Sequence, residues 1–155
     1  MLTADRLREI LDYDPETGIF LRDGKIAGTL NGLKYRQMKI EGSLYLVHRL
    51  AWLFVYGDWP SRQIDHINGI KDDNRISNLR LATGSENLRN RPKPRNNTSG
   101  YKGVSWINHY QKWQATIKFD GKNKFLGRFA TREEAAEVYN LAALQHHGEF
   151  ARLDL

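Results

Sequence analysis

Short apolar stretches separated by glycine fill the first third of the chain, before one longer apolar segment. Apolar residues at positions 2, 7, 10 and 11, with Thr3 as a candidate N-cap, predict a short amphipathic helix. Three β-like stretches follow at 19–21, 36–40 and 43–46, and they predict a small hairpin-rich sheet. The segment from His48 to Tyr56 is rich in Leu, Trp, Phe and Val and ends at Gly57, so we expect a buried helix there.

The pattern from residue 62 onward predicts a strand, a long polar loop, a second strand and a helix. The strands are expected at 62–67 and 79–82. Thr83 and Glu86 have the spacing of a capping box, which places Asn87 in the first turns of the helix. Two prolines end that helix, and a polar linker follows.

Regular alternation of apolar and polar positions sets the C-terminal part of the chain apart. Strands are expected at 101–107, 112–119 and 122–129. The dipeptide Asp120-Gly121 is a strong hairpin signal between the last two strands. Thr131 and Glu134 form a second capping box, which begins a helix with an alanine-rich stripe that runs to about His147. Together these segments predict three antiparallel strands packed on one helix.

The elements predict an α+β protein with two domains, and the distribution of charge agrees with that division. We expect the first domain at 1–90, a basic linker at 91–98 and the second domain at 99–155. The net charge is +6, yet residues 1–88 carry 12 basic and 12 acidic side chains, whereas residues 89–98 alone carry +4. Such a run is either a solvated linker or a flexible arm that follows phosphates. We favour the phosphate-binding arm, formed by Arg91, Lys93 and Arg95.

Several classes of protein are excluded by composition. The chain has no cysteine, so disulfides and cysteine-based zinc sites are ruled out. Its longest apolar run, residues 50–56, is far shorter than the roughly 20 residues that span a bilayer. We find no secretory signal, and we therefore expect a cytoplasmic protein without a membrane partner.

Four polar residues in the strand-loop-strand-helix segment suggest hydrolytic chemistry. Asp65 and Asn87 offer the hard oxygen ligands that Mg²⁺ prefers. His66 has an ordinary pKa near ~6.5 and can take a proton from water at neutral pH. With Asn78 between them in sequence, these residues would suit a metal-assisted cut in a phosphodiester. His48 has two interpretations, either a hydrogen-bonded core residue or a group near the scissile phosphate.

These residues resemble the HNH endonucleases of phages and mobile introns. The similarity extends from His48-Arg49-Leu50 through Asp65-His66-Ile67-Asn68-Gly69 and Asn74 to Asn78-Leu79-Arg80 and Ser85-Glu86-Asn87. The resemblance implies a ββα-metal core at about 62–90, with one divalent ion held by Asp65 and Asn87. It further implies that His66 activates the attacking water and that Asn78 braces the loop presenting His66. Asn87 stands where many relatives have His, which favours Mg²⁺, or Mn²⁺, over zinc or nickel.

The C-terminal part resembles the Apetala/ethylene-response-factor DNA-binding domain over nearly all of residues 99–154. The matching segments are 99–106, 112–115, 125–129, 134–136 and 147–153. In that family the sheet enters the major groove of DNA. The resemblance implies a set on or near the DNA-facing side at Lys102, Ser105, Trp106, Thr116, Lys118 and Phe125. Trp106 has a second interpretation, in which it packs against the helix. Lysine does not read guanine as arginine does, so the plant family's GC-rich target is not transferred.

The function expected from both resemblances is a site-selective, metal-dependent DNA endonuclease that nicks double-stranded DNA as a monomer or weak dimer. Its products would carry 5′-phosphate and 3′-hydroxyl ends. The alternative is a DNA-binding regulator with a degenerate nuclease domain. A third interpretation, an RNA-binding module, is consistent with the basic and aromatic residues but has no matching motif.

Overall fold

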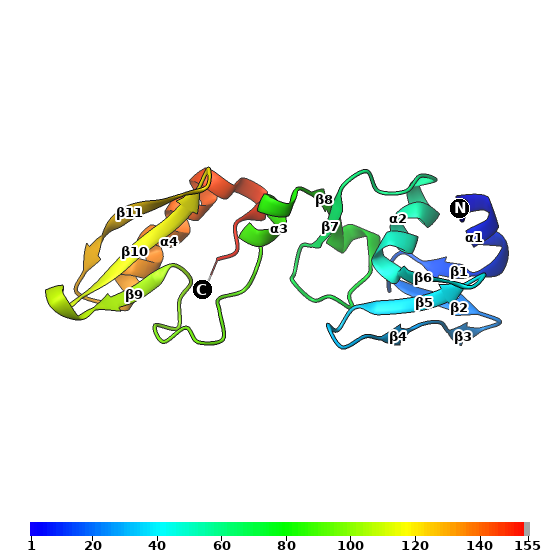
Figure 1. The fold of residues 1–155 in the computed structure, drawn as a ribbon, viewed down its shortest axis with the longest axis horizontal. Coiled ribbons are helices and arrows are strands. Elements are labelled where there is room, and N and C mark those ends of the chain that lie inside the picture. Colours follow the sequence, from blue (N-terminus) through cyan, green and yellow to red (C-terminus); the bar gives the residue numbers. More distant parts are fainter. Residues whose placement is uncertain (154–155) are drawn as a thin grey trace. The chain divides into compact units, whose positions relative to one another are not determined.

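A computed structural model describes residues 1–153, and these fall into two units divided between Asn87 and Leu88 (Figure 1). Helices and antiparallel sheets occur in both units, which confirms the expected α+β class. None of the helices within residues 1–153 is long and apolar enough to cross a membrane.

The first unit begins with one short helix and two small sheets. Helix α1 (Ala4–Ile10) is capped by Thr3, whose side chain accepts from the Arg6 amide at 3.3 Å. The first sheet has the strand order β1 (Asp12–Asp14), β2 (Ile19–Arg22), β3 (Lys25–Ile26). The second has the order β4 (Thr29–Leu30), β5 (Arg36–Ile40), β6 (Ser43–Leu46). Neither sheet is large enough to form a core alone, so both depend on the helix that follows.

Helix α2 (Val47–Tyr56) supplies the centre of the first hydrophobic core. Val47, Leu50 and Leu53 are almost fully buried, and residues from α1, β2 and β5 join them in one cluster. Gly57 ends the helix in the left-handed conformation with φ 84°, as the sequence predicted. Burial of this apolar stripe is what fixes the start of α2, including His48, against the rest of the unit.

A two-stranded hairpin completes the first unit, and the short helix after it contains the division between the two units. Strand β7 (Gln63–His66) pairs with β8 (Leu79–Ala82), and the 3₁₀ turn η1 (Ile76–Asn78) leads into β8. The capping box is formed, because Thr83 N donates to Glu86 Oε2 at 2.7 Å and Glu86 N donates to Thr83 Oγ1 at 3.2 Å. Helix α3 (Gly84–Arg89) follows it. Ile64 and Leu79 anchor the hairpin in the core of α2.

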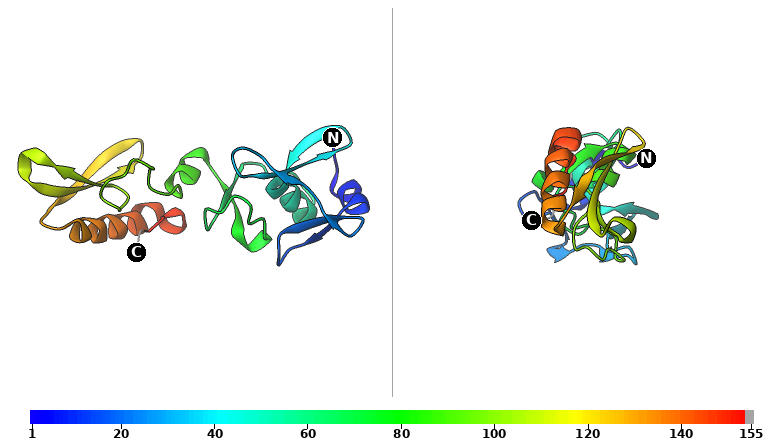
Figure 2. Two further views of the ribbon diagram at one scale, coloured as in Figure 1. Left: turned by 90° about the horizontal axis from the view of Figure 1, so that it is seen from below. Right: turned by 90° about the vertical axis from the view of Figure 1, so that its left-hand side faces the viewer.

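The second unit is a three-stranded sheet with one helix along one face (Figures 1 and 2). Its strands are β9 (Val104–Ile107), β10 (Lys112–Phe119) and β11 (Lys122–Phe129), with η2 (Asn108–Tyr110) between the first two. Helix α4 (Arg132–His147) has the complete capping box and is followed by η3 (Gly148–Phe150). Ala115 and Ile117 of β10 pack against the alanine stripe and Tyr139 of α4. The opposite face of the sheet remains open to solvent.

Candidate functional site

Asp65 lies in β7 as half of a buried ion pair. Its relative exposure is 4%, and the register places it opposite Arg80 of β8. Arg80 donates from Nε and Nη2 to Oδ2 of Asp65 at 2.9 and 2.8 Å. The carboxylate is therefore held by a guanidinium that the spacing of the motif did not indicate as its partner. A cation at Asp65 would share it with Arg80.

Asn87 lies on the same face of the hairpin as Asp65. Gln63 and Asp65 are two residues apart in β7 and so point to one side, and Asn87 donates from Nδ2 to Gln63 Oε1 at 3.2 Å. That bond engages the amide nitrogen of Asn87, whereas a cation is bound by the amide oxygen. No cluster of three His, Asp or Glu side chains within residues 1–153 could hold a metal. A carboxylate and an amide oxygen nevertheless fit a hard divalent ion that takes its other ligands from phosphate and water.

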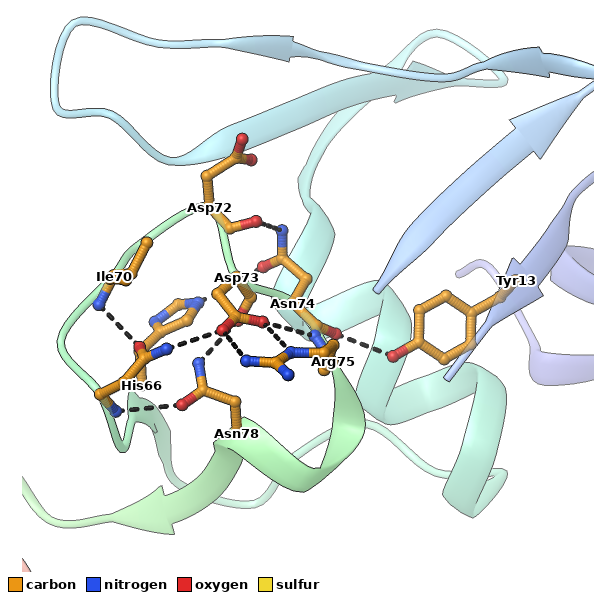
Figure 3. Close-up of polar contacts among 9 residues, drawn as sticks. Tyr13, His66, Ile70, Asp72, Asp73, Asn74, Arg75 and Asn78 are labelled. Carbon is orange, nitrogen blue, oxygen red and sulfur yellow. Dashed lines mark hydrogen bonds and ion pairs between the residues drawn. The ribbon is translucent and has the colours of Figure 1, made fainter. Parts of the chain in front are cut away.

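His66 ends β7 and is directed to the other side of the strand, where it meets Asn74 (Figure 3). His66 Nε2 lies 3.3 Å from Asn74 Oδ1, and Asn74 donates from Nδ2 to the main-chain oxygen of Asp72 at 3.1 Å. A main-chain oxygen can only accept, so it fixes the amide orientation and turns Oδ1 toward the imidazole. Nε2 must then carry the proton, and Nδ1 of His66 is left as the basic nitrogen.

Burial is the main influence on the charge of His66. It lowers the pKa of His66, while the bond to Asn74 and the negative charges of Asp65, Asp73 and Asp72 act in the opposite direction. The imidazole is 5% exposed and is kept neutral at neutral pH. A neutral, oriented imidazole is the form that can accept a proton.

His48 lies directly beside His66, at the start of α2. The two rings are 5.1 Å apart between centroids, and the ring of Tyr35 lies 5.4 Å from His48 and 6.0 Å from His66. His48 is 6% exposed, and its Nδ1 has no hydrogen-bond partner among the described residues. Burial, with smaller effects of His66 and Arg49, lowers its pKa to about 3. Tyr35 was missed by sequence analysis, because a lone aromatic residue in a short hairpin carries no signal.

Asn78 spans the loop between β7 and η1. Its Oδ1 accepts from the Asn68 amide at 3.0 Å, and its Nδ2 donates to the main-chain oxygen of Asp73 at 2.8 Å (Figure 3). Its own main-chain oxygen accepts from Ile67 N at 2.9 Å. These bonds are all to loop backbone, so the side chain shapes the loop and is a positioning group instead of a reacting one.

The candidate residues thus form two groups that meet at adjacent positions of one strand. Asp65 faces Asn87 and Arg80, whereas His66 faces Asn74 and the His48 ring. The first group offers carboxylate and amide oxygens, and the second offers an imidazole oriented to accept a proton. The arrangement is suited to hydrolysis of a charged ester.

The second unit presents a polar face opposite α4. The register aligns Ser105 with Gln114 and Gln114 with Arg128, and it pairs Thr116 with Phe125. Lys118 pairs with Asn123 on the same face. The Arg128 guanidinium lies 3.6 Å from the Tyr110 ring centroid and 5.1 Å from that of Phe125. Gln114 and Arg128 were not among the residues expected from the sequence.

Two residues of the expected DNA-facing set are placed differently. Trp106 pairs with Trp113, and their rings are 5.2 Å apart, so Trp106 lies on the apolar face shared with the helix. Lys102 donates from Nζ to the main-chain oxygens of Arg89 and Arg91 at 2.5 and 2.8 Å. Its ammonium therefore holds the preceding segment instead of facing outward with the sheet.

Hydrogen bonds also attach the basic segment, residues 91–98, to the chain that follows it. Lys93 donates to the main-chain oxygen of Gly100, and Asn97 donates from Nδ2 to Tyr101 O at 2.8 Å. Arg91 and Arg95 are exposed. These two arginines are the parts of the segment best placed to meet an external anion.

Comparison with known proteins adds one family match. Residues 45–89 match the family model "HNH endonuclease". The chain is 36% identical over 106 residues to "Protein 3.8" of Escherichia phage T7, covering 68% of this chain and 87% of that protein. It is also 36% identical over 107 residues to "Uncharacterized HNH endonuclease L560" of Acanthamoeba polyphaga mimivirus, covering 68% of this chain and 54% of the viral protein.

Other similarities are weaker. AP2-like ethylene-responsive transcription factor AIL6 of Arabidopsis thaliana is 46% identical over 50 residues, which is 31% of this chain and 9% of the plant protein. A solved structure titled "DNA binding and cleavage by the HNH homing endonuclease I-HmuI" covers 89% of this chain and 85% of its own, with a TM-score of 0.43 and 22% identity.

The buried His48 predicts a specific loss of stability in acid. Its folded pKa of about 3 lies below the ordinary value of 6.5, so the unfolded chain takes up the proton first as pH falls. The free energy of unfolding should therefore drop by about 2 kcal/mol between pH 7 and pH 5 on account of this residue. Urea unfolding of wild type and His48→Gln at the two pH values measures it. The exposed His109→Gln is the control, and equal pH dependence in wild type and His48→Gln would contradict the assignment.

Proposed function

Because the chain belongs to the HNH endonuclease family, we propose that it is a metal-dependent DNA endonuclease that nicks duplex DNA at selected sites. The observation that carries this proposal is the orientation of His66. Its Nε2 faces the accepting oxygen of Asn74, which leaves Nδ1 as the basic nitrogen. The preceding strand residue, Asp65, shares a face of the hairpin with Asn87.

In the proposed mechanism His66 Nδ1 takes a proton from water, whose oxygen forms the new bond to phosphorus while the bond to the 3′-oxygen breaks. The leaving 3′-oxygen takes a proton from solvent water, giving 3′-hydroxyl and 5′-phosphate ends. Asp65 and Asn87 would hold Mg²⁺, or Mn²⁺, through oxygen atoms. When bound, such an ion polarises the phosphate and stabilises charge on the leaving oxygen.

One such site within residues 1–153 supports cutting of a single strand per encounter. A monomer or weak dimer would then leave a nick, and a double-strand break would need two events or two chains. The buried His48 would serve as a packing partner that keeps the His66 ring in place, since its pKa of about 3 leaves it without the imidazolium proton that a general acid donates at neutral pH.

Site selection would fall to the open face of the second unit. Ser105, Thr116, Lys118 and Phe125 remain candidates for contact with duplex DNA, and Gln114 and Arg128 join them by register. Arg128 offers a planar set of donors steadied by two aromatic rings, which suits the major-groove edge of guanine. Arg91 and Arg95 would bind phosphates without regard to sequence.

The Asp65–Arg80 ion pair favours one competing function. A carboxylate already satisfied by a guanidinium is a weaker metal ligand, as expected of a DNA-binding regulator whose nuclease site is degenerate. A nicking assay on supercoiled plasmid with and without Mg²⁺ separates the two functions. Nicking that requires Mg²⁺ supports the nuclease, and binding without nicking supports the regulator.

The role of His66 is tested by substitution. His66→Ala should lower the cleavage rate by at least ~100-fold, because a general base contributes 10² to 10⁴, while DNA affinity remains nearly unchanged. Plasmid nicking measures the rate and a mobility-shift titration measures affinity. His109→Ala is the control, and nicking at the wild-type rate by His66→Ala would rule out the proposed base.

Substitutions in the second unit test which residues recognise the DNA site and which bind phosphates of any sequence. Arg128→Ala should weaken preference for the natural site, whereas Arg91→Ala with Arg95→Ala should weaken binding to all sequences. In the double variant, the slope of log binding constant against log salt concentration should also become shallower by up to ~0.9 per lost phosphate contact. Competition binding at several salt concentrations distinguishes the effects. Unchanged site preference in Arg128→Ala, with Lys118→Ala also unchanged, would mean that this face does not read the site.

A further inference from the structure

The loop residue that orients His66 is itself held by parts of the chain outside residues 45–89. Tyr13 of β1 donates its hydroxyl to the main-chain oxygen of Asn74 at 2.8 Å (Figure 3). The Tyr13 ring packs against Phe20 and Phe54, with ring centroids 4.6 and 5.5 Å away, and this packing fixes the position of the hydroxyl. Burial raises the pKa of Tyr13, which keeps this hydroxyl a donor.

The turn after β1 touches the same loop. A Cβ on Gly18 would lie 2.4 Å from Asn74 C and 2.3 Å from Arg75 N, and the residue has φ 73°. Ile76 N donates to Pro15 O at 3.3 Å. Backbone therefore packs directly on backbone here, and only glycine allows that approach.

Arg36 of β5 holds the other side of Asn74 through Asp72. Its Nε and Nη2 donate to Oδ1 and Oδ2 of Asp72, both at 2.8 Å, in a two-point contact. The main-chain oxygen of Asp72 in turn accepts from Asn74 Nδ2. The amide of Asn74 is thus fixed from its backbone by Tyr13 and from its side chain by the segment that Arg36 anchors.

We propose that Tyr13 and Arg36 are positioning residues for the reaction, which act by holding Asn74 so that its Oδ1 accepts the Nε2 proton of His66. This inference rests on the proposed function of His66 as the base. Displacement of a reacting group by about 1 Å can cost ~10²-fold in rate, so a hydroxyl two contacts away can affect turnover measurably. Tyr13 and Arg36 would then act from the N-terminal sheets through Asn74, without contacting the proton that is transferred.

Steady-state nicking of the full chain tests the inference. Tyr13→Phe removes only the hydroxyl, and we expect kcat to fall about tenfold with KM unchanged, because the effect concerns orientation and not DNA binding. Arg36→Ala should lower kcat at least as much, and Arg36→Lys should restore only part, since lysine cannot make the two-point contact. Matched controls are Tyr45→Phe, a half-buried tyrosine of the same unit, and Arg6→Ala, whose ion pair with Glu41 lies away from the loop.

A double-mutant cycle decides whether the effect passes through Asn74. In the Asn74→Ala background, Tyr13→Phe should change kcat less than twofold, because the group it holds is gone. A full tenfold loss in that background, or no loss in Tyr13→Phe with wild-type Asn74, would overturn the inference. Nicking at the wild-type rate by His66→Ala would instead remove the proposed function, so the two failures are distinguishable.

Discussion

The contact between Asn74 Oδ1 and His66 Nε2 is the constraint on which the site depends. An amide oxygen can only accept, so the contact places the imidazole proton on Nε2 and leaves the lone pair on Nδ1. Burial disfavours the charged imidazolium, whereas the carboxylates nearby and the bond to Asn74 favour it. These opposing effects keep a buried histidine able to accept a proton without being charged beforehand.

A second constraint is the buried pair of Asp65 and Arg80. Removing one partner of a buried ion pair leaves an uncompensated charge, so Arg80 stabilises the carboxylate in the hairpin when no cation is bound. In the proposed mechanism the same contact would compete with a divalent ion for Asp65. Metal affinity at the proposed site would therefore depend on whether Arg80 releases the Asp65 carboxylate, and the sequence spacing of Asp65, His66 and Asn87 does not reveal this competition.

Much of the fold could be predicted because its signals are local. The strands 112–119 and 122–129 have the predicted bounds, since alternation and the Asp120-Gly121 turn act over few residues. Both capping boxes form for the same reason. The site was harder to predict from the sequence, because the roles of Arg80, Tyr35 and Tyr13 arise from tertiary contacts that have no fixed sequence spacing. The sequence left two interpretations of Trp106, packing on the helix side or contact with DNA, because register decides the face and a shift of one residue reverses it; its pairing with Trp113 favours the first.

The protonation of His66 is the most direct measure of whether this chain holds an oriented base. Long-range ¹H–¹⁵N correlation of the imidazole in the full chain at pH 7.5, assigned with His66→Ala, reports which nitrogen carries the proton. A protonated Nε2 with an unprotonated Nδ1 is the expected result, and Asn74→Ala should turn it into a mixture of tautomers. A proton on Nδ1 in the wild-type chain, or a mixture unaffected by Asn74→Ala, would contradict the proposed orientation.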